Sequence, residues 1–368
     1  MSVWRSARPQ LHVGNMRQPT ERDKTEYLLR EVYRQDLGVP MMCLMPGFPL
    51  VAIVTPVYNG EVYLAETMMC VQALDYPNLV HVILDNASTD ATPEIIARYT
   101  GGPVPILTAR NPSTIPMAAN FNAALKLLPA ETAYFRLLCA DDLMTTDSIR
   151  RQVELAERHP DVAAVGCLEY CLRLRGQNIP QDQEIFDGKV VARAYLREEN
   201  TVFSGTHFLF RSDSIDKFQP FYDETLLPYI DAEAALRACL HRQFAFIHDG
   251  LAIRRVHANN AYEKHARMGF TYFDYLQVLI QYGPILLDRE EYNRRLVLQK
   301  RQCIRQLLRL RWRDGDRVTF NSHLKRLKVI GQPANWADFT DALGARALPW
   351  RGGESRAESV GIEKRPSY

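Results

Sequence analysis

The chain has 368 residues, of which 46% are apolar, so it is long enough for one large α/β domain with appendages or for two domains. Lysine and arginine number 45 against 43 aspartate and glutamate, and the formal charge of +2 gives no reason to expect a nucleic-acid partner. No segment reaches the roughly 18 apolar residues of a spanning helix, and the N-terminus lacks the apolar core of a signal peptide. We therefore expect a cytoplasmic protein.

The cysteines are odd in number and form no CxxC pair. The seven are Cys43, Cys70, Cys139, Cys167, Cys171, Cys239 and Cys303. Most fall inside apolar stretches, where buried thiols are a simpler explanation than a metal site. A secreted disulfide scaffold would carry its cysteines at higher density, so we expect a reducing compartment.

Strands and helices are predicted to alternate along the first 150 residues. After an extended preface with one helical stretch, ERDKTEYLLREVYRQD, the segment PLVAIVTPVYN predicts a buried strand rich in branched residues. LVHVILDNASTD, VPILTA and TAYFRLLC predict three more strands. GEVYLAETMMCVQALDYPN, ATPEIIARYT and IPMAANFNAALKLLP predict the helices between them. This order indicates an α/β fold with right-handed crossovers and a mostly parallel, Rossmann-like central sheet flanked by helices.

Polar clusters stand at the ends of three predicted strands: TPVYN after the first, DNASTD after the second and ADD after the fourth. Ligands of parallel sheets collect at the carboxyl ends of the strands, so these clusters should converge. In the second cluster, Ser88 and Asp90 fit a turn that caps the following helix. Asp85 and Asn86 stand earlier, at the strand tip, where they could instead bond a base or ribose.

The adjacent acids Asp141 and Asp142 fit the chemistry of a hard cation. Mg²⁺ or Mn²⁺ takes one or two protein carboxylates and fills its other positions with phosphate oxygens and water. The alternative is that the acids cap the helix in LMTTDSIRRQVELAERHP. Thr145 or Thr146 could cap that helix without them, which favours metal and diphosphate binding.

These motifs, in this order and spacing, resemble the nucleotide-sugar half of a family-2 glycosyltransferase with the GT-A fold. The resemblance covers roughly residues 48–260 and is densest over residues 50–150. It implies that Pro56 and Tyr58 line a nucleoside pocket and that Asp85 and Asn86 meet the base and ribose. Asn120 would stand before the diphosphate.

The same resemblance implies a metal site and a catalytic base. Asp142 would be the direct ligand of Mg²⁺ or Mn²⁺, with Asp141 beside it, and His257 in RRVHANNA would approach the diphosphate or metal. Cys139 stands where many members have the first acid of an Asp-x-Asp motif, so the site would depend on the adjacent pair. Asp231, in FYDETLLPYIDAEAALRAC, would be the catalytic base.

The assignment of the base has alternatives within the same segment. Ile230 replaces the first acid of the pair that this family usually has there, and Asp231 could simply cap the helix AEAALRACL. Asp223 and Glu224 are the reserve candidates for the base.

The implied activity is inverting, metal-dependent, non-processive transfer of a sugar from a nucleotide-diphospho-sugar to a glycan or lipid-linked glycan, as in polysaccharide biosynthesis. A processive synthase would carry Gln-x-x-Arg-Trp and membrane spans, and QLLRL at Gln306 lacks the tryptophan. A nucleotidyltransferase would need a basic, glycine-rich loop where TPVYNGEVYL stands. An inactive binding or scaffold protein on the same fold stays open, although the expected acids are present.

The predicted division is an N-terminal extension (1–47), a GT-A domain (48–260, with donor half 48–150 and acceptor half 151–260), helices (261–349) and a disordered tail (350–368). In residues 290–317, Leu296, Ile304, Leu307 and Leu308 share one helical face and basic residues fill the rest. That helix could pack on the catalytic domain with a solvated basic face, or give peripheral contact with anionic lipid. The oligomeric state stays open.

Overall fold

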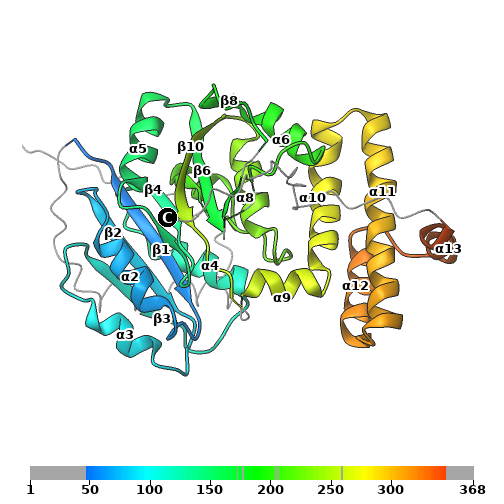
Figure 1. The fold of residues 1–368 in the computed structure, drawn as a ribbon, viewed down its shortest axis with the longest axis horizontal. Helices are drawn as coiled ribbons and strands as arrows, with labels where there is room; N and C mark the ends of the chain where they lie inside the picture. Colours follow the sequence, from blue (N-terminus) through cyan, green and yellow to red (C-terminus); the bar gives the residue numbers. More distant parts are fainter. Residues whose placement is uncertain are drawn as a thin grey trace, which may run out of the picture. The chain divides into compact units, whose positions relative to one another are not determined.

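The computed structural model describes residues 47–344, apart from residues 172, 176, 177, 204, 206, 258 and 259. The predicted N-terminal helix and the predicted tail lie outside the described residues. The description below therefore concerns the sheet, the helices that cover it and the helices that follow it (Figure 1).

Ten strands of the described part of the chain form one sheet, in the order β3-β2-β1-β4-β9-β6-β10-β5, with β7 beside β6 and β8 beside β10. The strands are β1 (Leu50–Val57), β2 (Leu79–Asp85), β3 (Ile106–Arg110), β4 (Thr132–Leu137), β5 (Leu143–Met144), β6 (Val162–Cys171), β7 (Arg173–Arg175), β8 (Ile185–Asp187), β9 (Leu209–Arg211) and β10 (Gln243–Ile253). Strands β3, β2, β1 and β4 run parallel, as do β6 and β10, whereas β9 is antiparallel to both β4 and β6. The predicted α/β class is confirmed, and each of the four predicted strands is present.

Helices between these strands follow the predicted order. They are α2 (Leu64–Gln72), α3 (Thr92–Arg98), α4 (Met117–Leu125), α5 (Ser148–Arg158), α6 (Gly188–Leu196), α7 (Asp213–Lys217) and α8 (Ile230–Cys239). The start of α6 lies against the end of α8: a Cβ at Gly188 would stand 1.8 Å from the carbonyl oxygen of Cys239. Only glycine can occupy this position without moving the backbone.

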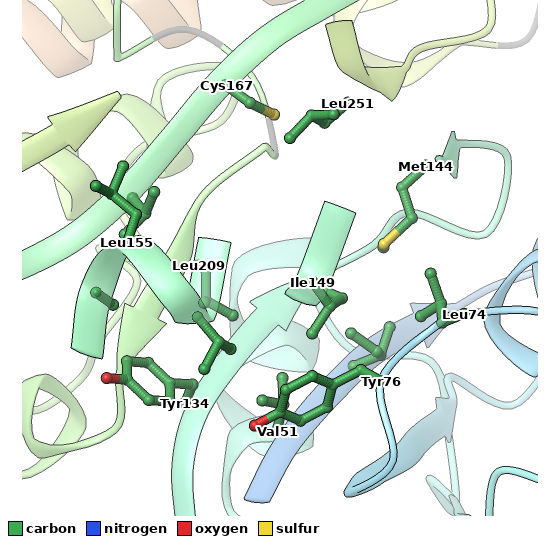
Figure 2. Packing of buried hydrophobic residues seen from close by; sticks show 14 of the residues in the cluster. Val51, Leu74, Tyr76, Tyr134, Met144, Ile149, Leu155, Cys167, Leu209 and Leu251 are labelled. Carbon is green, nitrogen blue, oxygen red and sulfur yellow. The ribbon is translucent and has the colours of Figure 1, made fainter. Parts of the chain in front are cut away.

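The main core lies between the sheet and α5. Every residue of β1 and β2 is buried, as expected for strands covered on both faces. Figure 2 shows side chains from β1, β4, β9 and α5 meeting in one cluster, with Val51, Tyr134, Leu209 and Ile149 among them. This packing holds the carboxyl ends of β1, β2 and β4 in register, which is the edge where the polar clusters stand.

A second cluster of buried residues lies in the helices that follow the sheet. These are α9 (Ala261–Arg267), α10 (Phe270–Leu286), α11 (Arg289–Leu308), a π-helical turn η1 (Arg309–Arg313), α12 (Arg317–Val329) and α13 (Trp336–Gly344). Ile304 and Leu307 of the predicted apolar face are fully buried there, and Leu296 and Leu308 pack against them. The predicted domain boundary after residue 260 falls just before α9 and stays a prediction. Among the residues that the structure describes, no helix combines the length and apolar composition needed to cross a membrane.

Candidate functional site

The loops after β1 and β2 are joined by hydrogen bonds. The backbone N–H groups of residues 59–61 donate to side-chain oxygens of Ser88, Thr92 and Asp90 at 2.8–2.9 Å. Asp90 also accepts from the start of α3, as predicted, but Ser88 binds the β1 loop instead of capping the helix. Tyr58 is held at this edge with its side chain 52% exposed.

Pro56 and Asp85 are both buried at this edge of the sheet. Pro56 lies within β1, opposite Leu84 of β2, so Tyr58 rather than Pro56 presents side-chain surface to solvent. The Asp85 carboxylate accepts from the Ser88 backbone N–H at 2.9 Å and forms an ion pair with Arg110. Its two oxygens therefore hold the turn after β2 and the end of β3 together.

Asn86 and Asn120 belong to one network of side-chain amides. Asn111 Nδ2 donates to the Oδ1 atoms of both Asn86 and Asn120 at 2.8 Å. Asn86 also bonds the backbone N–H and C=O of Ile115. The network fixes the loop after β3 and brings the first turn of α4 to the tips of β1 and β2.

The sequence analysis missed Arg110 and Asn111, which complete these contacts. Both stand at the end of β3, so the strand-end rule that selected the other three clusters would have selected them as well. Arg110 is the more consequential of the two, because its guanidinium is half-exposed and stands beside the acid predicted to meet the nucleoside.

Asp141, Asp142 and Cys139 offer ligand atoms that lie within 4.8 Å of one another. Asp142 is 7% exposed, and its Oδ1 accepts from the backbone N–H of Arg255 at 3.0 Å. Burial, and then the charge of Asp141, raise the pKa of Asp142 to about 8. Neither acid caps α5, whose N-cap is Asp147, and the predicted capping by Thr145 or Thr146 is wrong because no side chain caps this helix.

His257 lies beside the acids through a 2.8 Å hydrogen bond between its Nε2 atom and Asp141 Oδ2. Its ring packs against Tyr63, with centroids 4.7 Å apart, and the Arg255 guanidinium covers the same tyrosine. The arrangement fixes the orientation of Asp141, in the way that a histidine orients a ligating carboxylate. His257 contacts Asp141 directly but is not in the group of residues whose ligand atoms all lie within 4.8 Å of one another, and its role at the metal stays a prediction.

The donor set suits a hard divalent cation. Two carboxylates this close repel each other, and burial followed by the charge of Asp141 raises the pKa of Asp142, so a bound cation would stabilise the ionised pair. Burial and the neighbouring acids also raise the pKa of the Cys139 thiol well above its usual range, and hard cations prefer carboxylate oxygen to sulfur. The residues therefore fit Mg²⁺ or Mn²⁺ held by Asp141 and Asp142.

Asp231 lies in the first turn of α8 and faces the same region. It lines a small cavity with Leu137, Gly205, Phe208, Phe210 and Tyr222. Burial, and then the charge of Glu169, raise the pKa of Asp231 to about 7. The charges of Asp142, Asp141, Asp231 and Glu169 all help to raise the pKa of the Cys139 thiol.

The reserve acids are engaged elsewhere. Asp223 Oδ1 accepts from the backbone N–H and the hydroxyl of Thr225, and Glu224 accepts from Asn122 of α4. These contacts stabilise the loop before α8. No hydrogen bond or ion pair binds the Asp231 carboxylate within the described part of the chain, which leaves it available to a substrate.

Comparisons with known proteins agree with this geometry. The model of the family described as glycosyl transferase family 2 matches residues 52–218, which include every predicted donor-side residue but neither Asp231 nor His257. A Haemophilus influenzae protein named as an uncharacterized glycosyltransferase is 28% identical over 125 residues, which are 34% of this chain and 49% of that protein. The chain spans about half the length of the curated relatives it matches.

Two solved structures share the fold. TarS 1–349 of S. aureus, in complex with UDP-GlcNAc, superposes with a TM-score of 0.57 at 15% identity, over 80% of this chain and 81% of that one. The mannosyltransferase PcManGT of Pyrobaculum calidifontis, in complex with GDP-Man and Mn²⁺, gives 0.51 at 15% identity, over 86% and 85%. The family match on residues 52–218 and the shared GT-A fold support a family-2 glycosyltransferase domain in this chain.

Proposed function

We propose that the chain transfers a single sugar from a nucleotide-diphospho-sugar to a hydroxyl of a glycan or lipid-linked glycan, with inversion at the anomeric carbon. The observation that carries this proposal is the group of ligand atoms of Asp141, Asp142 and Cys139 just after β4, together with Asp231 in a cavity lined by Leu137 at the end of the same strand. This arrangement supports a cation site and a catalytic carboxylate at the carboxyl end of β4, the edge where this class of sheet binds ligands.

On the donor side, Asp142 and Asp141 would hold Mg²⁺ or Mn²⁺, with His257 orienting Asp141. When bound, the cation would neutralise the charge that develops on the leaving diphosphate. Tyr58 would cover the base, and Asp85, Asn86 and Asn120 would hold the nucleoside side of the donor. The complexes of TarS with UDP-GlcNAc and of PcManGT with GDP-Man and Mn²⁺ support a donor of this class.

On the acceptor side, Asp231 would take the proton of the attacking hydroxyl. A base with a pKa near 7 is matched to work at neutral pH, and the apolar wall of Phe208 and Phe210 limits water around it. Attack from the face opposite the leaving diphosphate passes through an oxocarbenium-like state and inverts the anomeric centre. A product of retained configuration would contradict this part of the proposal.

The function is tested by screening the purified chain against UDP- and GDP-sugars, with Mn²⁺, Mg²⁺ or EDTA, by thermal shift and by donor hydrolysis. We expect one donor to stabilise the fold and to be hydrolysed slowly, and both effects to need the cation. Binding without any hydrolysis or transfer would favour an inactive binding protein on the same fold. Release of pyrophosphate from a nucleoside triphosphate and a sugar phosphate would instead indicate a nucleotidyltransferase.

Tyr58→Ala should weaken binding of the nucleoside diphosphate by roughly 5- to 150-fold, because a base stacked on an aromatic ring is worth about 1–3 kcal/mol. Phe48→Ala is the matched control. Phe48 stands just before the opposite end of β1 and is 48% exposed, against 52% for Tyr58. Isothermal titration with UDP and GDP measures both variants, and equal dissociation constants would remove Tyr58 from the nucleoside pocket.

We further propose a cytoplasmic enzyme that contacts anionic lipid through α12. Within the predicted basic segment 290–317, Lys300 and Arg301 of α11 are paired with Asp338 and Asp341 of α13, so we place the contact at the end of this segment and along α12. Helix α12 contains no acidic residue, and its exposed positions follow one face at helical spacing. We define the basic face as Trp312, Arg313, Arg317, Val318, Lys325, Lys328 and Val329.

Vesicle flotation tests this contact. Each basic residue near an anionic surface adds about 1 kcal/mol, so Lys325→Gln with Lys328→Gln should weaken binding to phosphatidylglycerol vesicles by roughly 30-fold. Trp312→Ser should weaken it too, since an exposed tryptophan anchors at the headgroup level. Trp336→Ser, which alters a tryptophan that is 86% exposed on α13, should have no effect. Equal binding to neutral vesicles, or no effect of the lysine pair, would refute the basic face.

A further inference from the structure

The loop that leads into Asp231 is held by a residue from the C-terminal helices. Helix α8 begins after Tyr229, whose side chain makes no capping hydrogen bond. Asp274 of α10 instead accepts the backbone N–H groups of Leu227 and Tyr229 on its Oδ2 atom, at 2.9 and 3.2 Å. One fully buried carboxylate therefore binds the two residues that bracket Pro228, directly before the helix that carries Asp231.

An ion pair with Arg326 offsets the burial of the Asp274 carboxylate. Arg326 of α12 places Nη1 2.5 Å from Asp274 Oδ1, and its Nη2 donates to Gln277 Oε1 at 2.9 Å. Gln277 Nε2 in turn donates to the hydroxyl of Thr225 in the same loop at 2.5 Å. A buried carboxylate without a partner is costly, so removing Arg326 should loosen the hold of Asp274 on the loop.

The other end of the loop is attached to the donor half. Asn122 of α4 accepts from the Tyr222 backbone N–H at 2.8 Å and donates to its carbonyl oxygen at 2.9 Å. Asn120, two residues earlier in the same helix, belongs to the amide network at the strand tips. The loop thus runs from a helix of the donor side to a helix of the C-terminal region, and Asp231 follows it.

We propose that the Asp274–Arg326 pair positions Asp231. Through this pair, the C-terminal helices determine the orientation of the catalytic base. The inference depends on the role proposed for Asp231. A displacement of about 1 Å in a reacting group can cost on the order of 100-fold in rate, so a loop held at Leu227 and Tyr229 matters to the chemistry without touching the substrate. The helices α10 and α12 lie beyond the matched family segment. Under this proposal they contribute to the reaction by holding the loop before Asp231.

The test compares Arg326→Met, Arg326→Lys and Asp274→Asn in the full chain. The control is Arg301→Met, which breaks the ion pair of Arg301 with Asp341 between α11 and α13 and leaves the loop contacts intact. Hydrogen exchange over residues 223–231 reports the loop directly. Hydrolysis of UDP-GlcNAc or GDP-mannose, whichever the chain turns over, and the dissociation constant of that donor report the consequence.

We expect Arg326→Met to raise exchange over residues 223–231 and to lower the hydrolysis rate at least about tenfold, with an unchanged donor dissociation constant. Arg326→Lys retains the charge and should recover most of the rate. The control should change neither quantity. If Arg326→Met does not fold, Gln277→Ala removes the contact with Thr225 and one hydrogen bond of Arg326 but leaves the Asp274–Arg326 pair. It should raise exchange and lower the hydrolysis rate in the same way, by smaller amounts.

The outcomes separate this inference from the proposed function. If Asp231→Asn keeps full hydrolysis, the role of the base fails and the positioning role falls with it. If Asp231→Asn is inactive while Arg326→Met and Asp274→Asn keep the wild-type rate and exchange, only the positioning role is overturned. Equal losses in Arg326→Met and in the control would mean that the pair merely stabilises the fold.

Discussion

Asp142→Asn is expected to lower sugar transfer by at least about 100-fold, because a bound cation supplies several kcal/mol of charge stabilisation and each 1.4 kcal/mol is about tenfold in rate. Asparagine keeps an oxygen that can accept the Arg255 backbone N–H, so the local structure should persist. The substitution removes the negatively charged oxygen that would bind the cation. EDTA should reduce the wild type to the level of the variant and should not reduce the variant further.

The same substitution should leave the cation-free protein at least as stable at pH 8. The pKa of Asp142 is raised from about 3.8 in the unfolded chain to about 8 in the folded one. Between these values the folded state binds one more proton than the unfolded state, so its stability falls as pH rises through this window. Asp142→Asn removes this dependence, and thermal unfolding at pH 5 and pH 8 measures it.

Asp147→Asn is the matched control for this prediction. It changes the same residue type five positions later, at the N-cap of α5, outside the group of Asp141, Asp142 and Cys139. It should retain transfer and show no gain of stability at pH 8. Near-normal activity of Asp142→Asn in the presence of EDTA would mean that the reaction does not use this pair to hold a cation.

The donor half illustrates what sequence patterns can predict. The fully buried strands β1 and β2 are continuous runs of branched residues, so their positions and their ends could be inferred. The ends of parallel strands share one edge, and this geometry alone brought Tyr58, Asp85 and Asp142 to the same region. The roles of these residues stay predictions, because a strand end locates a side chain without showing what it binds.

The partners of these residues could not be inferred, because they come from distant segments. Arg255 is 113 residues away from Asp142 in the sequence, and Asp274 is 47 residues away from Leu227, yet each pair forms a hydrogen bond. Such contacts depend on how helices and loops pack after the sheet has formed, and no local period encodes them. Arg110 is different, since it ends a predicted strand.

Helix α11 shows the limit of a charge pattern. Its apolar positions predicted a buried face, and Ile304 and Leu307 are buried. Its basic residues were compatible with solvent or with lipid, and the structure instead pairs Lys300 and Arg301 with α13. A sequence shows that a face is charged, but the ion pairs that use this charge depend on the neighbouring helix.

Asp231→Asn is expected to lower the rate of transfer by about 10²- to 10⁴-fold, the usual contribution of general base catalysis. The donor dissociation constant should stay within about twofold, because the base meets the acceptor hydroxyl rather than the nucleotide. The Asp231 side chain does not cap α8, whose N-cap is Tyr229 with no side-chain capping hydrogen bond, so the rate should fall without a loss of stability. Asp223→Asn is both the control and the test of the rival base, and it should keep the wild-type rate.

The pH dependence of the wild-type rate provides an independent test of Asp231 as the base. A carboxylate acts as a base only when ionised, and the pKa of Asp231 is about 7 because of burial and then the charge of Glu169. The rate at saturating donor should therefore fall about tenfold per pH unit below 7 and level off above it. On the proposal that Asp142 holds the cation, saturating Mn²⁺ should displace the proton of Asp142 and leave the inflection to Asp231. Glu169→Gln removes the neighbouring charge and should move the inflection to lower pH, whereas an unmoved inflection, or one that persists in Asp231→Asn, would assign the base to another residue.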